Sequence, residues 1–242
     1  MRPIYKMTSK ILVGCPTCDL YEYCLEDYAH SVRNLHAPPY EIVLADNSKN
    51  NEFLHQLQLK GFTALKAPWH ESAKERIVQS RNVLRKMVLD QKYEWFFSVE
   101  MDVVVPQGAI ERLLKHKEKI VAGLYYTRQP DEKNQVKMLP VAQCFEKEKK
   151  WDKLRFPTTE ELKSKKPIPV AYTGLGCLLI HRSVLEKVEF RYKKTKDGEG
   201  GFDDAWFGFD AWKAGFKVML DPTLKCEHLI DKRPWKWSEI QK

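Results

Sequence analysis

Residues Trp95–Pro106 read Trp-Phe-Phe-Ser-Val-Glu-Met-Asp-Val-Val-Val-Pro and place two acidic side chains inside an apolar, β-prone stretch. A strand that is buried on both faces reads as a near-continuous apolar run, and ionised carboxylates are rarely buried without a partner. Side chains two residues apart share one face of a strand, so we expect Glu100 and Asp102 to point to the same side. Divalent cations such as Mg2+ and Mn2+ bind carboxylate oxygens, and the stretch therefore predicts a metal site. A polar strand end beside Pro106 is the alternative interpretation.

Composition narrows the class of protein. The chain has 242 residues, of which 43% are hydrophobic and 12% aromatic, enough for a substantial core. No apolar run approaches the roughly 18 residues that span a bilayer, and the first residues lack a signal-peptide core, so we expect a cytoplasmic protein. Six cysteines are too sparse for a disulfide scaffold, which predicts reduced thiols. The formal charge of +8 favours anionic partners, and nucleic acid, nucleotide diphosphates and an anionic membrane surface all stay open.

Strand and helix patterns alternate in the first part of the chain. This alternation predicts an α/β fold, with a mixed, mostly parallel, Rossmann-like central sheet flanked by helices. Ligands of such sheets bind beyond the carboxyl ends of the strands, where residues 15–18, 46–48 and 100–102 are expected to meet. The predicted strands are 10–14, 41–46, 62–66 and 95–106, and the predicted helices are 20–35, 53–59 and 74–89.

The second part of the chain is less regular. Residues 127–169 are polar with few helix or strand cues, and we expect a flexible excursion that includes a lid or a hairpin. The tail, residues 229–242, is basic and contains two tryptophans. No composition shift marks a linker, so residues 1–242 are predicted to form a single domain. The remaining predicted strands are 120–126, 170–180 and 218–220, and the remaining predicted helices are 107–117, 182–187 and 203–214.

Short motifs follow the predicted strands in a fixed order: Pro16-Thr17 after the first strand, Asp46-Asn47 after the second, and Arg81 on the long helix. Together with the acidic pair at 100–102 they resemble the GT-A fold glycosyltransferases, most closely the family 2 type, over nearly all of the chain. The resemblance implies that Pro16, Thr17 and Asn47 line a nucleotide-sugar pocket. It also implies that Asp46 contacts the nucleotide base and that Arg81 lies near the diphosphate.

The Asp-x-Asp motif of that family looks like Glu100-Met101-Asp102 in this chain. The resemblance implies that Asp102 and Glu100 bind Mn2+ or Mg2+, and that Glu100 also contacts the nucleotide sugar. Glu in place of the first Asp departs from the family pattern and lengthens one ligand arm, so Asp102 is the ligand that matches the motif. Many relatives carry a His that completes the metal site, and the position of His228 implies this role, with a packed histidine as the alternative.

Two further motifs concern the transfer itself. Asp203-Asp204 resembles the Glu-Asp motif that opens the catalytic helix of the family, which implies that Asp204 accepts a proton from an acceptor hydroxyl with Asp203 beside it. Helix capping is the alternative for both residues. Gly174-Leu175-Gly176 is similar to the Gly-containing strand that lines the acceptor side in these enzymes, where small residues let a sugar approach the backbone. The resemblance implies that Gly174 contacts the nucleotide sugar.

The implied activity is metal-dependent transfer of a hexosyl-type sugar from a UDP- or GDP-linked donor to an acceptor hydroxyl, with inversion expected. The acceptor class stays open among glycans, lipids, proteins and small molecules.

Other classes of protein give three competing interpretations. Cys15, Cys18, His30 and His36 have the spacing of a zinc site, which with the charge of +8 would suggest nucleic-acid binding. Cys15 closes an apolar strand, however, and nucleic acid is therefore disfavoured as a partner. A sugar-phosphate nucleotidyltransferase can use a similar sheet with two carboxylates, but the turn after the first strand lacks the Lys or Arg typical of that class. The tail 229–242 suits either peripheral contact with a membrane or packing on the domain.

Overall fold

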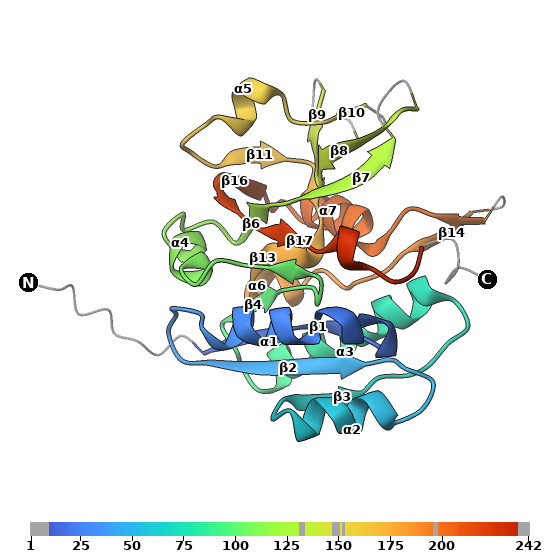
Figure 1. Ribbon diagram of the computed structural model, residues 1–242. Coiled ribbons are helices and arrows are strands. Elements are labelled where there is room, and N and C mark those ends of the chain that lie inside the picture. The colour runs from blue at the N-terminus through green and yellow to red at the C-terminus, as the bar shows by residue number, and fades with distance from the viewer. Residues whose placement is uncertain (1–9, 131–133, 147–150, 152, 196–197, 237–242) are drawn as a thin grey trace, which may run out of the picture.

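An eight-stranded sheet forms the centre of the molecule (Figure 1). The structure is a computed structural model and describes residues 10–130, 134–146, 151, 153–195 and 198–236. The strands of the central sheet are β1 (Ile11–Thr17), β2 (Tyr40–Asp46), β3 (Thr63–Lys66), β4 (Trp95–Ser98), β6 (Ile120–Leu124), β11 (Ile168–Val170), β13 (Leu178–His181) and β16 (Val218–Lys225).

The strand order is β11-β16-β6-β13-β4-β1-β2-β3. The pairs β1–β2, β1–β4, β2–β3 and β6–β16 are parallel, whereas β13 is antiparallel to both of its neighbours and β11 is antiparallel to β16. The predicted α/β class with a mixed, mostly parallel sheet is therefore confirmed.

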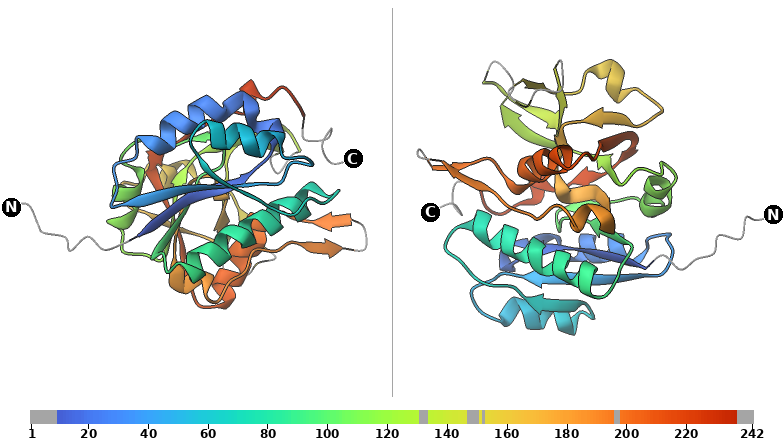
Figure 2. Two further views of the ribbon diagram at one scale, coloured as in Figure 1. Left: turned by 90° about the horizontal axis from the view of Figure 1, so that it is seen from below. Right: turned by 180° about the vertical axis from the view of Figure 1, so that it is seen from behind.

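Helices cover both faces of the sheet. Ile11 and Val13 pack into one apolar cluster and Leu12 into the other, as the alternation of side chains along a strand requires. Figure 2, in its left view, shows α1 and α2 on one side of the strands and α3 on the other. The first face carries η1 (Asp19–Cys24), α1 (Leu25–Arg33), α2 (Glu52–Leu59) and α4 (Ala109–Leu114), and the second carries α3 (Ala73–Asp90), α6 (Arg182–Leu185) and α7 (Asp203–Lys213).

Residues 95–106 do not form one continuous strand, and this corrects the first prediction. The strand β4 ends at Ser98, the chain turns at residues 101–102, and a two-residue strand, β5 (Val103–Val104), follows. β5 pairs with β17 (Glu227–His228) instead of joining the central sheet. Glu100 and Asp102 therefore lie in a turn, and the pleat of a strand does not set their directions.

Residues 127–169 are more regular than predicted. The expected hairpin is present as β7 (Tyr126–Pro130) and β8 (Val136–Pro140). A small sheet joins β10 (Leu154–Arg155), β9 (Ala142–Phe145) and β12 (Tyr172–Thr173), and α5 (Thr159–Leu162) begins with a capping box. Figure 1 shows these elements together at the top of the molecule. The prediction of irregular structure is wrong because β9 and β11 pair with strands distant in sequence, and local patterns do not reveal such partners.

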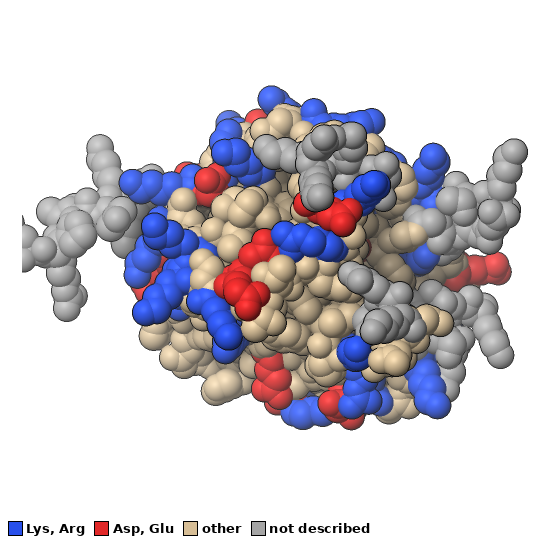
Figure 3. Space-filling model, turned by 90° about the horizontal axis from the view of Figure 1, so that it is seen from above, with Lys and Arg blue, Asp and Glu red and all other residues tan. Residues whose placement is uncertain are grey.

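The remaining elements complete the region near the C-terminus. They are η2 (Leu175–Cys177), β14 (Lys193–Thr195), β15 (Gly198–Gly200) and η3 (Ile230–Lys232). The helix α7 ends before Gly215, whose φ of +82° lies in the left-handed region that glycine adopts without strain. Within the described part of the chain, no helix combines the length and apolar character needed to cross a membrane. Figure 3 shows Lys and Arg side chains around the face seen from above, with Asp and Glu between them.

Candidate functional site

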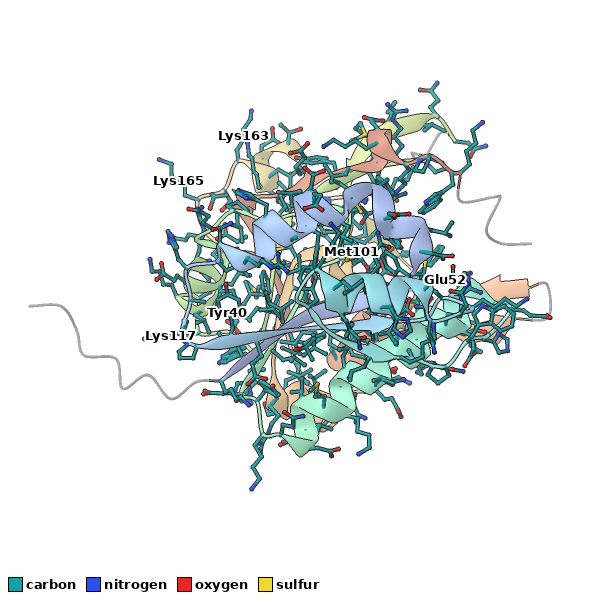
Figure 4. All side chains as sticks on the ribbon, turned by 60° about the horizontal axis from the view of Figure 1, so that its bottom comes forward. Tyr40, Glu52, Met101, Lys117, Lys163 and Lys165 are labelled. Atoms are coloured by element: carbon teal, nitrogen blue, oxygen red, sulfur yellow. The ribbon has the colours of Figure 1, made fainter. Side chains whose placement is uncertain are left out.

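A pocket opens where β1, β2 and β4 end. Five of the predicted site residues line it: Pro16, Thr17, Asn47, Arg81 and Glu100. The carboxyl ends of parallel strands meet at one edge of a sheet, which is why residues distant in sequence converge here. The other lining residues are Cys18, Leu20, Tyr21, Ala73, Arg76, Ile77 and Met101. Met101 is labelled near the centre of Figure 4.

Asp46 lies at the end of β2 but does not line the pocket. Its side chain is fully buried, and both carboxylate oxygens already have partners. Oδ1 accepts hydrogen bonds from the Ser48 backbone N–H at 3.1 Å and from Ser48 Oγ at 2.5 Å, and Oδ2 accepts one from Lys66 Nζ at 2.7 Å. Asp46 therefore holds the turn that presents Asn47 to the pocket.

Arg81 is the centre of a buried network at the base of the pocket. It is 2% exposed and uses three different nitrogens to reach three partners. Nε donates to Asp203 Oδ2 at 2.5 Å, Nη1 to Ser98 Oγ at 3.1 Å, and Nη2 to Glu100 Oε1 at 2.5 Å. Burial opposes the charge of Arg81, but Asp203 and Glu100 outweigh it and hold the pKa of the guanidinium above its usual value. The network ties α3, β4 and α7 together and fixes both carboxylates.

Burial raises the pKa of Glu100, although Arg81 opposes this shift. The Glu100 carboxylate accepts a hydrogen bond from Arg81, whereas Asp102, two residues later, lies against His228 and Arg233.

Asp102 is 2% exposed and lies next to His228 and Arg233. Arg233 donates to Asp102 Oδ2 from Nε at 3.1 Å and also from Nη2, and the same Nη2 lies 3.0 Å from His228 Nε2. His228 Nδ1 donates to the Tyr126 carbonyl oxygen at 2.8 Å, and its Nε2 lies 3.5 Å from Asp102 Oδ2. Burial opposes ionisation of Asp102, but the facing His228 and Arg233 outweigh it and lower its pKa. The structure thus brings together Asp102 and His228, two of the predicted metal ligands.

Asp203 and Asp204 are the first two residues of α7. The N-cap position is Phe202, without a side-chain cap, so neither aspartate is the N-cap residue. Asp203 instead binds Arg81, whereas Oδ1 of Asp204 accepts a hydrogen bond from the Ala205 backbone N–H at 2.7 Å. Burial, followed by the charges of Asp203 and Glu100, raises the pKa of Asp204 to about 7. A carboxylate with this pKa can accept a proton near neutral pH.

Gly174 is small for a reason that the sequence does not reveal. A Cβ at this position would lie 2.0 Å from the hydroxyl oxygen of Tyr125 and 2.6 Å from a methyl group of Val141. Tyr125 in turn accepts a hydrogen bond from the Gly176 backbone N–H at 3.0 Å and stands edge-on to His228. Gly174 therefore makes room for the tyrosine that supports His228.

Arg233 and Tyr125 belong to this region, and sequence reasoning missed both. Arg233 lies in the basic tail, whose composition we read as a membrane or packing surface. Its spacing of five residues from His228 was the only local signal. Tyr125 ends a predicted strand and carries no motif, so nothing in the sequence singles it out.

The zinc interpretation is contradicted by the structure. Cys15 is buried within β1 and contacts the Tyr28 hydroxyl at 3.8 Å, whereas His30 and His36 are exposed. Across the described residues, no three His, Cys, Asp or Glu side chains form a group that could hold a metal ion.

Similar structures identify the fold. Matches include a crystal structure of GalNAc-T7 with UDP, GalNAc and Mn2+, at a TM-score of 0.63 and 15% identity over 92% of this chain and 44% of that chain. They also include S. aureus TarS, at a TM-score of 0.55 and 12% identity over 87% of this chain and 35% of that one. Both are GT-A glycosyltransferases. The chain has the GT-A fold.

A third similar structure is A197 from STIV, at a TM-score of 0.50 and 16% identity over 92% of this chain and 87% of that chain. This GT-A chain spans less than half the length of the GalNAc-T7 and TarS chains that it matches. No protein-family model matches the sequence, and no curated protein matches it either.

Proposed function

We propose that this GT-A chain is a glycosyltransferase of the family 2 type, which transfers a hexosyl-type sugar from a UDP- or GDP-linked donor to an acceptor hydroxyl. The observation that carries the proposal is Asp204 at the start of α7, whose pKa is raised to about 7 by burial and then by the neighbouring Asp203. Asp203 in turn binds Arg81, which lines the pocket at the strand ends. GalNAc-T7 was crystallised with UDP, GalNAc and Mn2+, and this likeness supports a nucleotide-sugar donor.

In the proposed reaction, Asp204 accepts the proton of the acceptor hydroxyl while the hydroxyl oxygen attacks the anomeric carbon of the sugar. The bond from that carbon to the diphosphate oxygen breaks, and the nucleoside diphosphate leaves with its electron pair. Arg81 holds Asp203 and Glu100 in place, and the negative charges of these two residues raise the pKa of Asp204, while the charge of Arg81 opposes this shift. Pro16, Thr17 and Asn47 line the donor pocket, and Asp46 fixes the turn behind Asn47. Inversion remains a prediction, and NMR of the product anomer tests it.

The donor set at Asp102 and His228 fits a divalent cation. A carboxylate oxygen and an imidazole nitrogen are ligands that Mn2+ accepts, and the positively charged Nη2 of Arg233 already stands between them. The hydrogen bond from His228 Nδ1 to Tyr126 orients the ring as metal-ligating histidines usually are. We therefore propose that Asp102 and His228 hold Mn2+ or Mg2+, which would stabilise the charge on the leaving diphosphate. The proposed pair leaves out Glu100, whose role as a ligand stays a prediction, because its carboxylate is hydrogen-bonded to Arg81.

Purified protein incubated with a panel of UDP- and GDP-sugars plus Mn2+ or Mg2+ tests the proposal through release of nucleoside diphosphate. We expect release from one donor and transfer to an acceptor, with Asp204→Asn lowering transfer by about 10²–10⁴-fold because the general base is lost. Asp90→Asn, at the exposed end of α3, is the matched control and should keep full activity.

If no sugar of the panel yields nucleoside diphosphate, and pyrophosphate is released from a nucleoside triphosphate and a sugar phosphate, the proposal is replaced by a nucleotidyltransferase.

The cytoplasmic location and peripheral membrane contact stay predictions.

A further inference from the structure

The residues after His228 return to the site instead of leaving it. We call residues 229–236 the C-terminal segment. Lys232 Nζ donates to Asp27 at 3.0 Å, and Trp235 Nε1 donates to the Leu20 carbonyl oxygen at 2.9 Å. The Trp235 ring also stands edge-on to Tyr21, a residue of the pocket wall, with ring centroids 5.9 Å apart. Figure 2, in its left view, shows this part of the chain beside the first helices.

Arg233 is the residue of the segment that enters the site. Its Nη2 contacts both Asp102 Oδ2 and His228 Nε2, which are the two atoms that would ligate a metal. An arginine guanidinium stays protonated in proteins, so Arg233 carries a positive charge at this position. A cation is thus already present between the two proposed ligands.

We propose that Arg233 and a divalent cation compete for Asp102 and His228, so that metal binding requires the C-terminal segment to release the site. This inference rests on the metal ligands of the proposed function. Two positive charges cannot share one carboxylate oxygen and one imidazole lone pair without strong repulsion, so occupation by either excludes the other. Lys232 and Trp235, which anchor the segment to Asp27 and Leu20, lie on either side of Arg233 in the chain. Displacement of Arg233 from the site therefore pulls on both anchors and loosens the segment as a whole.

Titration with Mn2+ alone, followed by electron paramagnetic resonance of the free ion, tests the competition. Arg233→Gln should bind Mn2+ about tenfold more tightly than the unaltered protein, because the ion no longer displaces a charged hydrogen-bonded pair. Lys225→Gln removes the same charge from an exposed position of β16, outside the C-terminal segment, and should change the affinity less than twofold. Asp102→Asn should abolish binding.

Equal or weaker Mn2+ affinity in Arg233→Gln would overturn the proposal, as would absence of Mn2+ binding in both proteins. The second result would leave sugar transfer itself possible without metal, and nucleoside diphosphate release in the presence of a chelator would show this separately. Conversely, if Arg233 and Mn2+ compete but no sugar is transferred from any donor, the proposed function is refuted and the inference about Arg233 is still supported.

Limited trypsin digestion gives an independent readout of segment release. Saturating Mg2+ should increase cleavage after Lys232 several-fold in the unaltered protein, as read by intact mass, because the segment leaves η1 and α1. The bond after Arg233 is not a usable site, since trypsin does not cleave before proline and Pro234 follows. The same metal should have little further effect on cleavage after Lys232 in Arg233→Gln, whose segment has already lost its bond to Asp102. Unchanged cleavage in the unaltered protein at a Mn2+ or Mg2+ concentration shown to saturate the site would contradict the proposal.

Discussion

A single carboxylate, Asp204, links the stability of the protein to its proposed chemistry. Its pKa of about 7 in the folded protein lies above the ordinary aspartate value of 3.8. Between these values the folded state binds more protons than the unfolded state, so the free energy of unfolding falls as pH rises. The loss of stability caused by ionising Asp204 in the folded protein is complete once the pH exceeds the folded-state pKa.

We therefore expect Asp204→Asn to raise the Tm relative to the unaltered protein, and to raise it more at pH 8 than at pH 5. Asparagine cannot ionise, so the variant avoids the cost of burying the charge. Asp204 keeps partial contact with solvent, and we expect the gain to widen by about 1–2 kcal/mol between the two pH values, or several degrees in Tm. Thermal scans at both pH values measure it, and a gain that stays constant would show that Asp204 is not the group with the raised pKa.

At the scale of elements, the turn at Gly174 links β12 to η2 and packs against the tyrosine beside His228. Gly174 has a φ of −62°, which any residue adopts, so the requirement for glycine is purely steric. We expect Gly174→Ala to lower the free energy of unfolding by about 1–3 kcal/mol, because its Cβ would overlap the Tyr125 hydroxyl.

Gly108→Ala is the matched control for this prediction. Gly108 has a φ of −82°, and a Cβ there would meet no atom within 4 Å. Urea unfolding of both variants measures the difference, and adding Tyr125→Phe to Gly174→Ala should recover part of the loss. Equal stability of the two alanine variants would refute the steric explanation.

Much of the element order could be read from local patterns. The strand after Lys10, the strand ending at Asp46 and the long helix from residue 74 all appear within a few residues of their predicted bounds. Their patterns are local, since apolar runs and helical periodicity depend on near neighbours. The turn at Glu100–Asp102 was missed because β5 pairs with β17, more than a hundred residues away.

The same reasoning explains what the sequence showed of the site. Strand ends collect ligands in any such sheet, so the convergence of Pro16, Asn47 and Glu100 followed from topology. The partners of the carboxylates did not follow, because Arg81–Asp203 and Asp102–Arg233 join residues more than a hundred positions apart.

At the scale of the whole molecule, the Arg81 network joins the two parts of the chain, since Arg81, Ser98 and Glu100 come from the first part and Asp203 from the second. Arg81→Met should lower the free energy of unfolding by about 3–5 kcal/mol, because it leaves buried carboxylates without a counter-charge. Urea denaturation measures this loss.

Lys86→Met provides the control on the same helix. Lys86 forms an exposed ion pair with Asp90, and such pairs contribute about 0.5 kcal/mol or less. A loss in Arg81→Met no larger than in Lys86→Met would show that the network does not hold the two parts together. Adding Asp203→Asn to Arg81→Met should recover part of the stability.

Three exposed lysines of this basic chain lie away from the pocket. Lys117, Lys163 and Lys165 are exposed and lie toward the side of the molecule where β2 begins at Tyr40, whereas Glu52 lies toward the opposite side (Figure 4). The pocket opens where β1, β2 and β4 end, so these lysines lie away from it. Part of the positive charge of the chain therefore lies away from the pocket.

The place of β13 has a consequence for how the protein is made. This strand lies between β4 and β6 and is antiparallel to both, yet it follows them in the chain by more than fifty residues. During synthesis on the ribosome, β4 emerges with its Phe96 and Phe97 edge open and has no partner on that side until Leu178–His181 leaves the exit tunnel. Open apolar strand edges are where nascent chains aggregate. We therefore expect the nascent chain to be most prone to aggregation in the interval between the synthesis of β4 and that of β13.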